Sequence, residues 1–277
     1  MQNVYAEAAS ETSLVSTQDR GLLYGDGVWE TLPVRAGKPQ LLDAHLARLQ
    51  RGLTALNIQD APLAQLQEAV HDYVRNLDKA VLKIIVMRGD GERGYNPQAV
   101  KEPRLILQSS KLPDYPPAYA EQGVTMGVCQ TRLAYQPLLA GFKHLNRLEQ
   151  VLARAEFADD WQEALVSDYH GQVIEGTMSN LFVITQNDQV LTPDLSGCGI
   201  AGIMRDFIIT QLQQIGLTVQ QCPLCLEADI LTAKALFLSN SLIGVWPVQR
   251  LQVATQTYSY NIPSLVRQLQ HLTQSVT

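Results

Sequence analysis

The apolar residues of this chain come in short runs of strand length, and this limits what the chain can fold into. Residues 80–87 form one such run, which is broken only by Lys83. Further segments that predict strands lie at residues 105–107, 123–129, 164–167, 173–175, 181–184, 190–192, 217–221 and 235–239. None reaches the roughly 18 apolar residues that a membrane-spanning helix needs. The pattern predicts many short strands, with an antiparallel meander over residues 164–192.

Helical spacing of apolar residues separates several of these runs. Within residues 43–56 the leucines share one face, Asp43 is the predicted N-cap, and His45, Arg48 and Arg51 lie off that face. Further helices are predicted at residues 61–76, after Lys143 (from Leu145, Leu148, Leu152 and Ala155), up to about residue 215 after a glycine-rich start, at 226–230 and at about 262–273.

Residues 10–40 predict a strand that starts near residue 10, then a loop and a second strand. Residues 19–27 are expected to form a glycine-punctuated turn. Residues 28–32 alternate between apolar and polar side chains, and a hairpin turn is expected at residues 37–39.

Three prolines close together, Pro113, Pro116 and Pro117, predict a stiff linker. The 277-residue length suits one large domain or two of medium size. We therefore expect a smaller α/β domain over residues 1–113, a proline-rich linker over 114–122 and a larger domain over 123–277.

Composition narrows the class of function. Apolar residues make up 46% and charged residues 17% of the chain, which supports a sizeable core and argues against disorder. The net charge is −6 and the isoelectric point is about 5.4, so nucleic acid is an unexpected partner. The first residues lack the charged-then-apolar pattern of a signal peptide. A cytoplasmic protein that binds no membrane is expected.

The four cysteines do not predict a metal site. Cys222 and Cys225 form a C-x-x-C pair, but a zinc site needs a second pair or histidines at ligand spacing. A redox pair would open a helix after a strand. We expect reduced thiols in or near the core, together with Cys129 and Cys198.

A glycine motif at residues 89–94 resembles a dinucleotide-binding fingerprint but lacks its context. The pattern G-x-G-x-x-G follows a strand, yet Tyr95-Asn96-Pro97 comes next and resists the helix that must begin there. One alternative is a mobile loop whose Arg88, Arg93 and Tyr95 grip a carboxylate. The other is a solvated hairpin, and the residues alone leave both open.

Two residues in the stretch 141–182 suit Schiff-base chemistry. Such an enzyme needs a nucleophilic amine, and the apolar residues before Lys143 are able to desolvate one. A pyridoxal phosphate enzyme also needs an acid beside its pyridine nitrogen, and Glu175 ends a strand just before Gly176. The ordinary alternative is that both are solvated surface charges.

A phosphate site is suggested further along the chain. The glycines of residues 197–202 precede a helix, whose first N–H groups and dipole attract anions. Asn240 and Ser241 end a strand and offer additional donors. Many helices begin after glycine, so this pattern alone is weak.

Several motifs, taken in order, resemble those of the fold-type IV, or class IV, pyridoxal phosphate enzymes. That family includes branched-chain aminotransferase, D-amino-acid aminotransferase and aminodeoxychorismate lyase. The resemblance covers nearly the whole chain. It rests on residues 24–31, 45–49, 88–95, Lys143, 175–182, 202–205, 240–241 and 246–248.

The resemblance implies an α+β fold of two domains with mixed, mostly antiparallel sheets and flanking helices. It also implies pyridoxal 5'-phosphate as the cofactor and a homodimer. Lys143 would hold the cofactor covalently, and Glu175 would pair with its pyridine nitrogen. The phosphate would be bound by Arg48, by the backbone N–H groups of Ile203 and Met204, and by Asn240 or Ser241.

Within the family, residues 143–151 are similar almost letter for letter to the lysine segment of aminodeoxychorismate lyases. Thr31 also fits that branch. The resemblance implies conversion of 4-amino-4-deoxychorismate to 4-aminobenzoate and pyruvate, with Lys143 and Thr31 as catalytic residues. An aminotransferase of the same fold is the alternative.

The residues that would bind the substrate are less clear from the resemblance. Some relatives carry a basic residue two positions after the Thr31 equivalent, where this chain has Pro33. Carboxylate recognition is therefore expected from Arg93, Tyr95 and Arg147, with Trp29 also in the substrate site.

Overall fold

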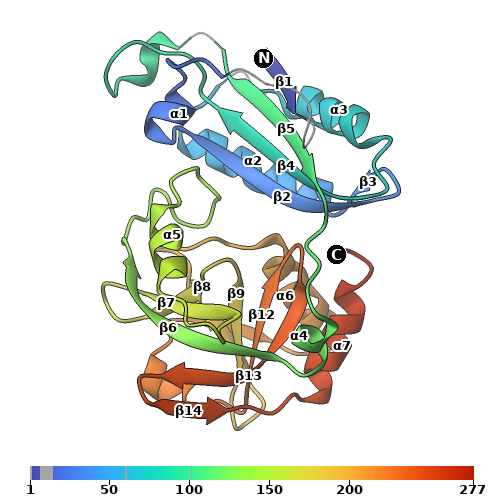
Figure 1. Cartoon of the computed structure of the whole chain (residues 1–277), viewed down its shortest axis with the longest axis vertical. Coiled ribbons are helices and arrows are strands. Elements are labelled where there is room, and N and C mark those ends of the chain that lie inside the picture. The colour runs from blue at the N-terminus through green and yellow to red at the C-terminus, as the bar shows by residue number, and fades with distance from the viewer. Residues whose placement is uncertain (1, 7–14, 60, 101) are drawn as a thin grey trace. The chain divides into compact units, whose positions relative to one another are not determined.

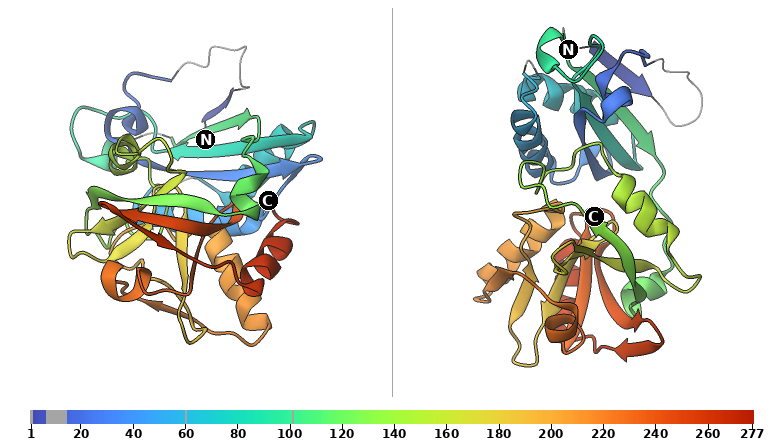
Figure 2. Two further views of the ribbon diagram at one scale, coloured as in Figure 1. Left: turned by 60° about the horizontal axis from the view of Figure 1, so that its bottom comes forward. Right: turned by 90° about the vertical axis from the view of Figure 1, so that its left-hand side faces the viewer.

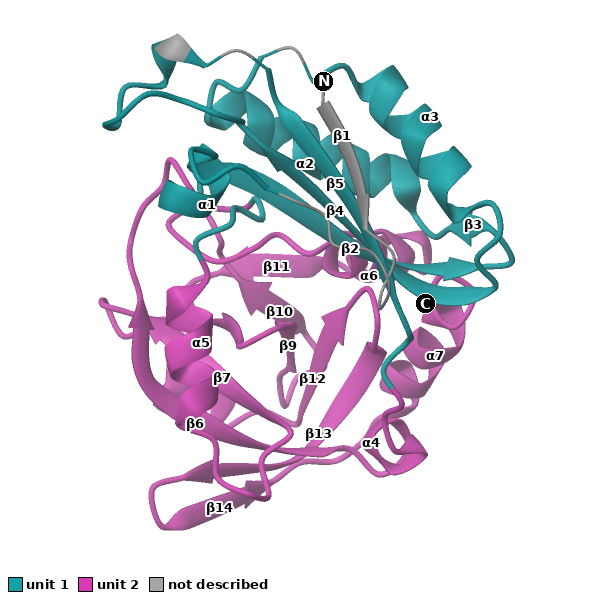
Figure 3. Cartoon of the chain, turned by 45° about the horizontal axis from the view of Figure 1, so that its top comes forward, with its two compact units in different colours: residues 1–113, 142–146 teal, residues 114–141, 147–277 magenta. Residues whose placement is uncertain are grey.

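The computed structural model describes the backbone of residues 2–6, together with residues 15–59, 61–100 and 102–277. The chain splits into two compact units (Figure 3). Unit 1 comprises Met1–Pro113 and Phe142–Asn146, and unit 2 comprises Asp114–Gly141 and Arg147–Thr277. The five residues around Lys143 thus belong to unit 1, although the chain on both sides of them belongs to unit 2.

Unit 1 contains a five-stranded sheet in the order β1-β5-β4-β2-β3 (Figure 1). Its strands are β1 (Gln2–Ala6), β2 (Gly27–Arg35), β3 (Lys38–Pro39), β4 (Lys79–Met87) and β5 (Arg104–Ser110). β1 pairs with β5 in parallel, and the other pairings are antiparallel. Its helical segments are α1 (Arg20–Tyr24), α2 (Leu42–Ala55), α3 (Leu63–Val74) and the 3-10 turn η1 (Pro97–Ala99).

The two longer helices of unit 1, α2 and α3, cover one face of this sheet (Figure 2). Alternate residues of β2 point toward α2, and Val28, Leu32 and Val34 are buried there. From α2, Leu49 and Leu53 are buried against them, as their helical spacing predicts. The opposite face of β2 carries Trp29 and Thr31, which are only half-buried.

Local details of unit 1 differ from the sequence predictions. Residues 20–24 form the short helix α1, capped by the Asp19 side chain, where only a turn was predicted. Asp43 lies in the first turn of α2 but is not its N-cap, because that position is Leu41 and has no side-chain cap. The strand predicted near residue 10 falls on residues 7–14, which lie outside the described part of the chain.

Unit 2 contains a nine-stranded sheet whose main path runs β11-β10-β9-β12-β13-β6-β7-β8, with β14 paired to β13. Its strands are β6 (Val124–Leu133), β7 (Glu163–Asp168), β8 (Val173–Gly176), β9 (Asn180–Ile184), β10 (Val190–Pro193), β11 (Val219–Cys222), β12 (Ala235–Asn240), β13 (Gly244–Val253) and β14 (Gln256–Ser259). Its helical segments are α4 (Pro117–Glu121), α5 (Leu148–Ala155), α6 (Ile203–Gln214), the π-helical turn η2 (Leu226–Ile230) and α7 (Ser264–Thr273).

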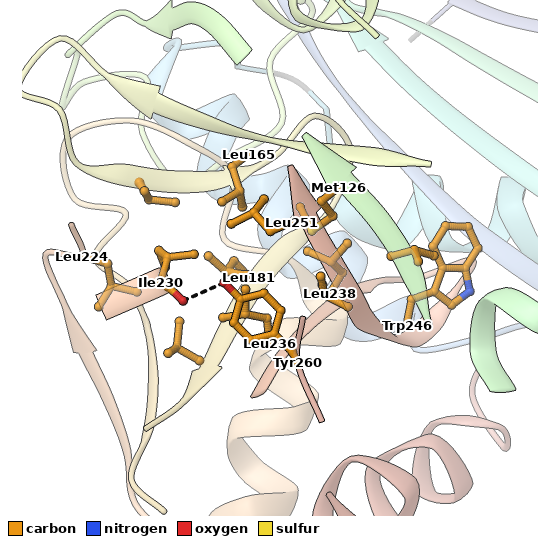
Figure 4. Packing of buried hydrophobic residues seen from close by; sticks show 14 of the residues in the cluster. Met126, Leu165, Leu181, Leu224, Ile230, Leu236, Leu238, Trp246, Leu251 and Tyr260 are labelled. Atoms are coloured by element: carbon orange, nitrogen blue, oxygen red, sulfur yellow. Dashed lines mark hydrogen bonds between the residues drawn. The ribbon is translucent and has the colours of Figure 1, made fainter. Parts of the chain in front are cut away.

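One core of unit 2 gathers side chains from several of these strands and from η2 (Figure 4). Leu181 and Leu238 pack there with Met126, and the Tyr260 hydroxyl donates a hydrogen bond to the Ile230 carbonyl at 2.9 Å. A second cluster packs α6 and α7 against the sheet, with the Phe182 and Phe237 rings stacked at 4.7 Å.

The unit 2 sheet is not the simple meander predicted over residues 164–192. β7 pairs with β8, and β9 pairs with β10, but β8 lies at the far end of the sheet order from β10. Strands β13 and β14 were not predicted at all. The predicted linker contains α4, which belongs to unit 2.

The apolar stripe predicted after Lys143 is largely not buried. In α5 the side chains of Leu148, Val151 and Leu152 are 76%, 61% and 60% exposed, and Ala153 is the buried residue. Among the described residues no helix is long and apolar enough to cross a bilayer. The cysteines are free thiols; Cys129 and Cys198 are buried as expected, whereas Cys225 is exposed.

Candidate functional site

In unit 1, the residues around Lys143 pair with the edge of β2. The Lys143 carbonyl accepts a hydrogen bond from the Trp29 N–H at 2.9 Å, and the Leu145 N–H donates to the Gly27 carbonyl at 3.0 Å. The Trp29 indole Nε1–H donates to the His144 carbonyl at 3.2 Å. Pairing with a regular strand therefore fixes the backbone position of Lys143. A rigid backbone of this kind can hold a reacting side chain precisely.

The Lys143 ammonium lies over the Trp29 ring, 4.0 Å from its centroid. The structure thus brings together two residues that the sequence analysis assigned to the site. The apolar residues ahead of the lysine desolvate its amine less than predicted. Phe142 is buried, but Leu138 is exposed. The aromatic face of Trp29 is the apolar surface beside this amine.

Thr31 and Lys83 lie directly opposite one another on β2 and β4, on the same sheet face as Trp29. The Thr31 hydroxyl oxygen is buried and has no hydrogen-bond partner within the described chain. A buried hydroxyl without a partner is costly unless a ligand satisfies it. The Lys83 ammonium lies 4.5 Å from the Trp29 ring centroid, and burial lowers its pKa. Sequence reasoning treated Lys83 only as an interruption of a strand.

Arg48 lies on the opposite, helix-covered face of the same sheet, inside a buried ionic cluster. Its Nε donates to Glu30 Oε1 at 2.8 Å and its Nη2 to Glu30 Oε2 at 2.5 Å. His45 Nδ1 lies 2.7 Å from Glu30 Oε2. Burial alone would raise the Glu30 pKa, but the Arg48 charge and the hydrogen bonds from His45 and Arg48 lower it to about 2. Arg48 is thus held in one orientation by a carboxylate.

Sequence reasoning missed Glu30, although a signal for it exists. Glu30 alternates with Val28 and Leu32, so it points into the core, where a charged side chain needs a partner. His45 and Arg48 are three residues apart on α2 and therefore share a face that supplies that partner.

The loop of residues 88–96 is mostly exposed, and arginine side chains hold parts of it in place. Arg88 donates to Asp26 through Nε at 2.7 Å and Nη2 at 3.0 Å, so it does not serve the carboxylate-gripping role considered for it. Arg20 donates to the Gly94 and Tyr95 carbonyls at 2.8 and 3.0 Å. Arg88 therefore anchors the start of the loop through its side chain, and Arg20 holds the backbone at the tip of the loop.

Arg93 and Tyr95, the loop residues assigned to the substrate, both point outward. The Tyr95 side chain is 84% exposed, and its ring makes an edge contact with Tyr24 at 5.3 Å. Arg93 is also exposed. Within unit 1, neither residue lies in the group formed by Lys143, Trp29 and Thr31.

In unit 2, Glu175 is buried near the end of β8. Its Oε2 accepts a hydrogen bond from the Ile200 N–H at 2.9 Å. Burial lowers the pKa of Arg147, the residue before α5, and the negative charge of Glu175 opposes that effect. Glu175 is therefore an oriented carboxylate in a desolvated setting, as its assigned role requires.

The turn that follows Glu175 is organised by a second carboxylate, Glu163 of β7. Its Oε1 accepts from the Thr177 N–H at 2.9 Å, and its Oε2 accepts from the Ser179 hydroxyl at 3.1 Å. Arg154 approaches the same carboxylate at 3.8 Å. Sequence reasoning did not single out Glu163, because its partners are revealed only by the pairing of β7 with β8.

The predicted anion site corresponds to the N-terminus of α6, which begins at Ile203 with Gly202 as N-cap. No side chain of the described residues caps this end, and the first N–H groups of a helix have no partner within it. Ile203 and Met204 are buried, so their backbone N–H groups are what this helix end offers to an anion.

Asn240 is used mainly to build a turn. Its Oδ1 accepts from the Leu242 and Ile243 N–H groups at 2.9 Å each, and its Nδ2 donates to the Met178 carbonyl at 3.0 Å. These contacts use both polar atoms of the side chain, so the observed role of Asn240 is to build this turn.

Comparison with known proteins places this geometry in a family. The model of the family described as amino-transferase class IV matches residues 27–251. The chain is 37% identical to an aminodeoxychorismate lyase of Vibrio harveyi, over 91% of this chain and 93% of the relative. It is 28% identical to a branched-chain-amino-acid aminotransferase of Escherichia coli strain K12, over 86% of this chain and 80% of that protein.

Solved structures give the same result. The crystal structure of 4-amino-4-deoxychorismate lyase from Pseudomonas aeruginosa matches with a TM-score of 0.90 at 44% identity, over 96% of each chain. The Escherichia coli branched-chain amino acid aminotransferase has the same fold, with a TM-score of 0.82 at 24% identity over 95% of this chain and 90% of that one. The predicted fold class and resemblance are confirmed: this chain belongs to the class IV aminotransferase family.

Proposed function

We propose that this protein is a pyridoxal phosphate-dependent lyase that converts 4-amino-4-deoxychorismate to 4-aminobenzoate and pyruvate. The observation that carries the proposal is the arrangement on β2, where the Lys143 amine covers the Trp29 ring on the face that presents the unpartnered Thr31 hydroxyl. The similarity to relatives named as aminodeoxychorismate lyases supports the choice of substrate.

The residues present fit the proposed cofactor. Thr31 offers a buried hydroxyl that lacks a partner, and Glu175 is a buried, oriented carboxylate. We propose that Lys143 binds the cofactor covalently and that Glu175 keeps its pyridine nitrogen protonated. Arg48, the N–H groups of Ile203 and Met204, and Ser241 or Asn240 are proposed to bind its phosphate.

Each step then depends on a group of this chain. The bound cofactor supplies an electron sink for the carbon that bears the substrate amine. The Lys143 amine, when neutral, would act as the general base that removes the proton from that carbon. The C–O bond to the enolpyruvyl group breaks, and Lys143, with the Thr31 hydroxyl, returns a proton to the released enol to give pyruvate. Loss of the C–O bond makes the ring aromatic, which favours the forward direction.

Substrate recognition is proposed for Trp29, Arg93, Tyr95 and Arg147. Arg147 is a half-buried cation, and burial strengthens its attraction for a carboxylate. Arg93 and Tyr95 are exposed at the tip of a loop. We propose that they reach the substrate site of a second copy of the chain in a dimer. The exposed apolar side chains Leu148, Val151 and Leu152 of α5 support a homodimer.

The test is a direct assay of the purified protein with 4-amino-4-deoxychorismate and pyridoxal phosphate. The proposal expects equal yields of pyruvate and 4-aminobenzoate without any 2-oxo acid. Lys143→Ala should abolish both products, whereas Arg75→Ala, at an exposed position of unit 1, should leave them unchanged. If the wild-type protein forms neither product, the proposal is wrong.

An aminotransferase of the same fold is the second candidate, because the Escherichia coli branched-chain aminotransferase is similar over most of the chain. Activity that requires leucine or D-alanine together with a 2-oxo acid would favour it. We also propose a cytoplasmic location, which cell fractionation would test. The assay with and without 2-oxo acid separates the two enzyme activities.

A further inference from the structure

Asn180, the first residue of β9, bridges both ends of a three-residue segment with one side chain. Its Nδ2 donates to the Ile200 carbonyl at 2.8 Å, and its Oδ1 accepts from the Gly202 N–H at 3.0 Å. The residue is 6% exposed, so both hydrogen bonds are shielded from water. An amide is suited to this position, because it offers a donor and an acceptor at the same time.

The bridged segment, residues 200–202, touches two features of the candidate site. At one end, the Ile200 N–H donates to Glu175 Oε2 at 2.9 Å. At the other end, Gly202 is the N-cap of α6 and so sets the direction of its first N–H groups. The carboxylate and the helix start are therefore linked through one short piece of backbone.

The close approach of Asn180 requires glycine at position 202. A Cβ on Gly202 would lie 2.0 Å from Asn180 Oδ1, closer than non-bonded atoms tolerate. The Gly202 backbone has φ −67°, which any residue adopts, so the space needed by the amide is what excludes a side chain. The Ala201 N–H also donates to the Gly141 carbonyl at 3.0 Å, which holds the middle of the segment.

We propose that Asn180 is a positioning residue that orients the Glu175 carboxylate and the N-terminus of α6 together. It would thereby set recognition of the pyridine nitrogen and of the phosphate of one cofactor through a single amide. This inference rests on the proposed function. Its distinctive consequence is that loss of Asn180 weakens both kinds of recognition at once, although Asn180 itself touches no ligand.

The experiment measures the two kinds of recognition separately on the full-length apoprotein. Pyridoxal, which lacks the phosphate, reports on the ring site, and inorganic phosphate, used as a competitor of pyridoxal phosphate binding, reports on the phosphate site. Asn180→Leu removes both hydrogen bonds at similar volume. Gly202→Ala disturbs the same contact from its other side and leaves Asn180 in place. Circular dichroism and thermal melts establish that each variant is folded.

Tyr260→Phe is the matched control, because it removes one buried hydrogen bond, to the Ile230 carbonyl, from the core of unit 2 (Figure 4). Its cofactor affinity is expected to stay at the wild-type value. Both test variants are expected to lose about tenfold or more in affinity for pyridoxal and for phosphate, since buried groups lose their partners. The absorbance of bound pyridoxal phosphate should also shift in its dependence on pH, because Glu175 is no longer held.

The outcomes are distinct. If a folded Asn180→Leu or Gly202→Ala variant keeps wild-type affinity for either ligand, the linked role of Asn180 is wrong. If Tyr260→Phe loses as much as the test variants, the effect is general destabilisation and the proposal is equally wrong. If the wild-type protein binds neither pyridoxal nor pyridoxal phosphate, the proposed function fails first and this inference fails with it.

Discussion

The ammonium of Lys143 and the ring of Trp29 form a cation–π pair, with the nitrogen 4.0 Å from the ring centroid. The same tryptophan anchors the lysine segment twice, through its backbone N–H to the Lys143 carbonyl and through its indole N–H to the His144 carbonyl. One residue of β2 thus positions both the backbone and the side chain of the proposed catalytic lysine.

Trp29→Ala is expected to lower lyase activity at saturating cofactor by about 3- to 30-fold, since the lysine segment loses both the ring packed beside Lys143 and the indole hydrogen bond to the His144 carbonyl, positioning contacts worth roughly 0.5–2 kcal/mol. Steady-state kinetics of pyruvate release measure this change. Trp29→Phe keeps an aromatic face but loses the indole N–H, so its activity should lie between that of the wild type and that of Trp29→Ala. Wild-type activity in Trp29→Ala would show that the ring contact does not support catalysis.

Glu30→Gln is expected to destabilise the protein by about 3–5 kcal/mol, because it leaves the buried Arg48 charge without its carboxylate. Urea unfolding monitored by circular dichroism measures the difference in the free energy of unfolding. Asp72→Asn is the control, because its ion pair with Arg75 is mostly exposed and should contribute less than about 1 kcal/mol. Equal effects of the two substitutions would contradict the importance of burial here.

Acid is expected to weaken unit 1 in two stages. Burial lowers the His45 pKa, so protonation of His45 opposes folding as the pH falls below its unfolded value of about 6.5. Glu30 has its pKa lowered to about 2 against the effect of burial, chiefly by the Arg48 charge. Its stabilisation is therefore complete above about pH 4.5 and is lost as the pH falls toward 2.

Urea unfolding across this pH range tests the titration. The free energy of unfolding should decline from about pH 6.5 downward and steepen below about pH 4.5. In Glu30→Gln, the fall in the free energy of unfolding below that pH should be smaller than in the wild type. A free energy that stays constant or rises as acid is added would contradict this account.

Arg20→Lys is expected to loosen the loop of residues 88–96, because a lysine ammonium cannot reproduce the forked donation to the Gly94 and Tyr95 carbonyls. If Arg93 and Tyr95 bind the substrate, KM should rise by about tenfold while kcat changes less. Hydrogen exchange of the loop amides should increase in parallel. Unchanged KM together with faster exchange would remove the loop from substrate recognition.

Much of the fold could be predicted because its signals are local. The apolar run of β4 and the leucine spacing of α2 follow the periods of strand and helix directly. β13 escaped prediction because Pro247 argues against a central strand, yet Pro247 pairs with Phe237 of β12 inside the sheet. The leucines of α5 misled the prediction in the opposite way, since helical spacing cannot say what covers a face.

The residues of the candidate site likewise fall into those with a local sequence signal and those without one. Lys143, Arg48 and Glu175 lie in motifs of the family, so they could be proposed as site residues from the sequence alone. Glu30 and Asn180 act on other residues through contacts between distant parts of the chain. Contacts of that kind depend on how strands pair, which residue spacing alone does not specify.

The most direct test of the central claim identifies the lysine that carries the cofactor. Borohydride treatment of the wild-type protein loaded with pyridoxal phosphate fixes the cofactor to that lysine, and peptide mass spectrometry then locates it. Lys83 is the alternative lysine that this experiment can identify, because its ammonium lies 4.5 Å from the centroid of the same Trp29 ring. The account predicts the modification on Lys143 alone; modification of Lys83, or of no lysine, would contradict it.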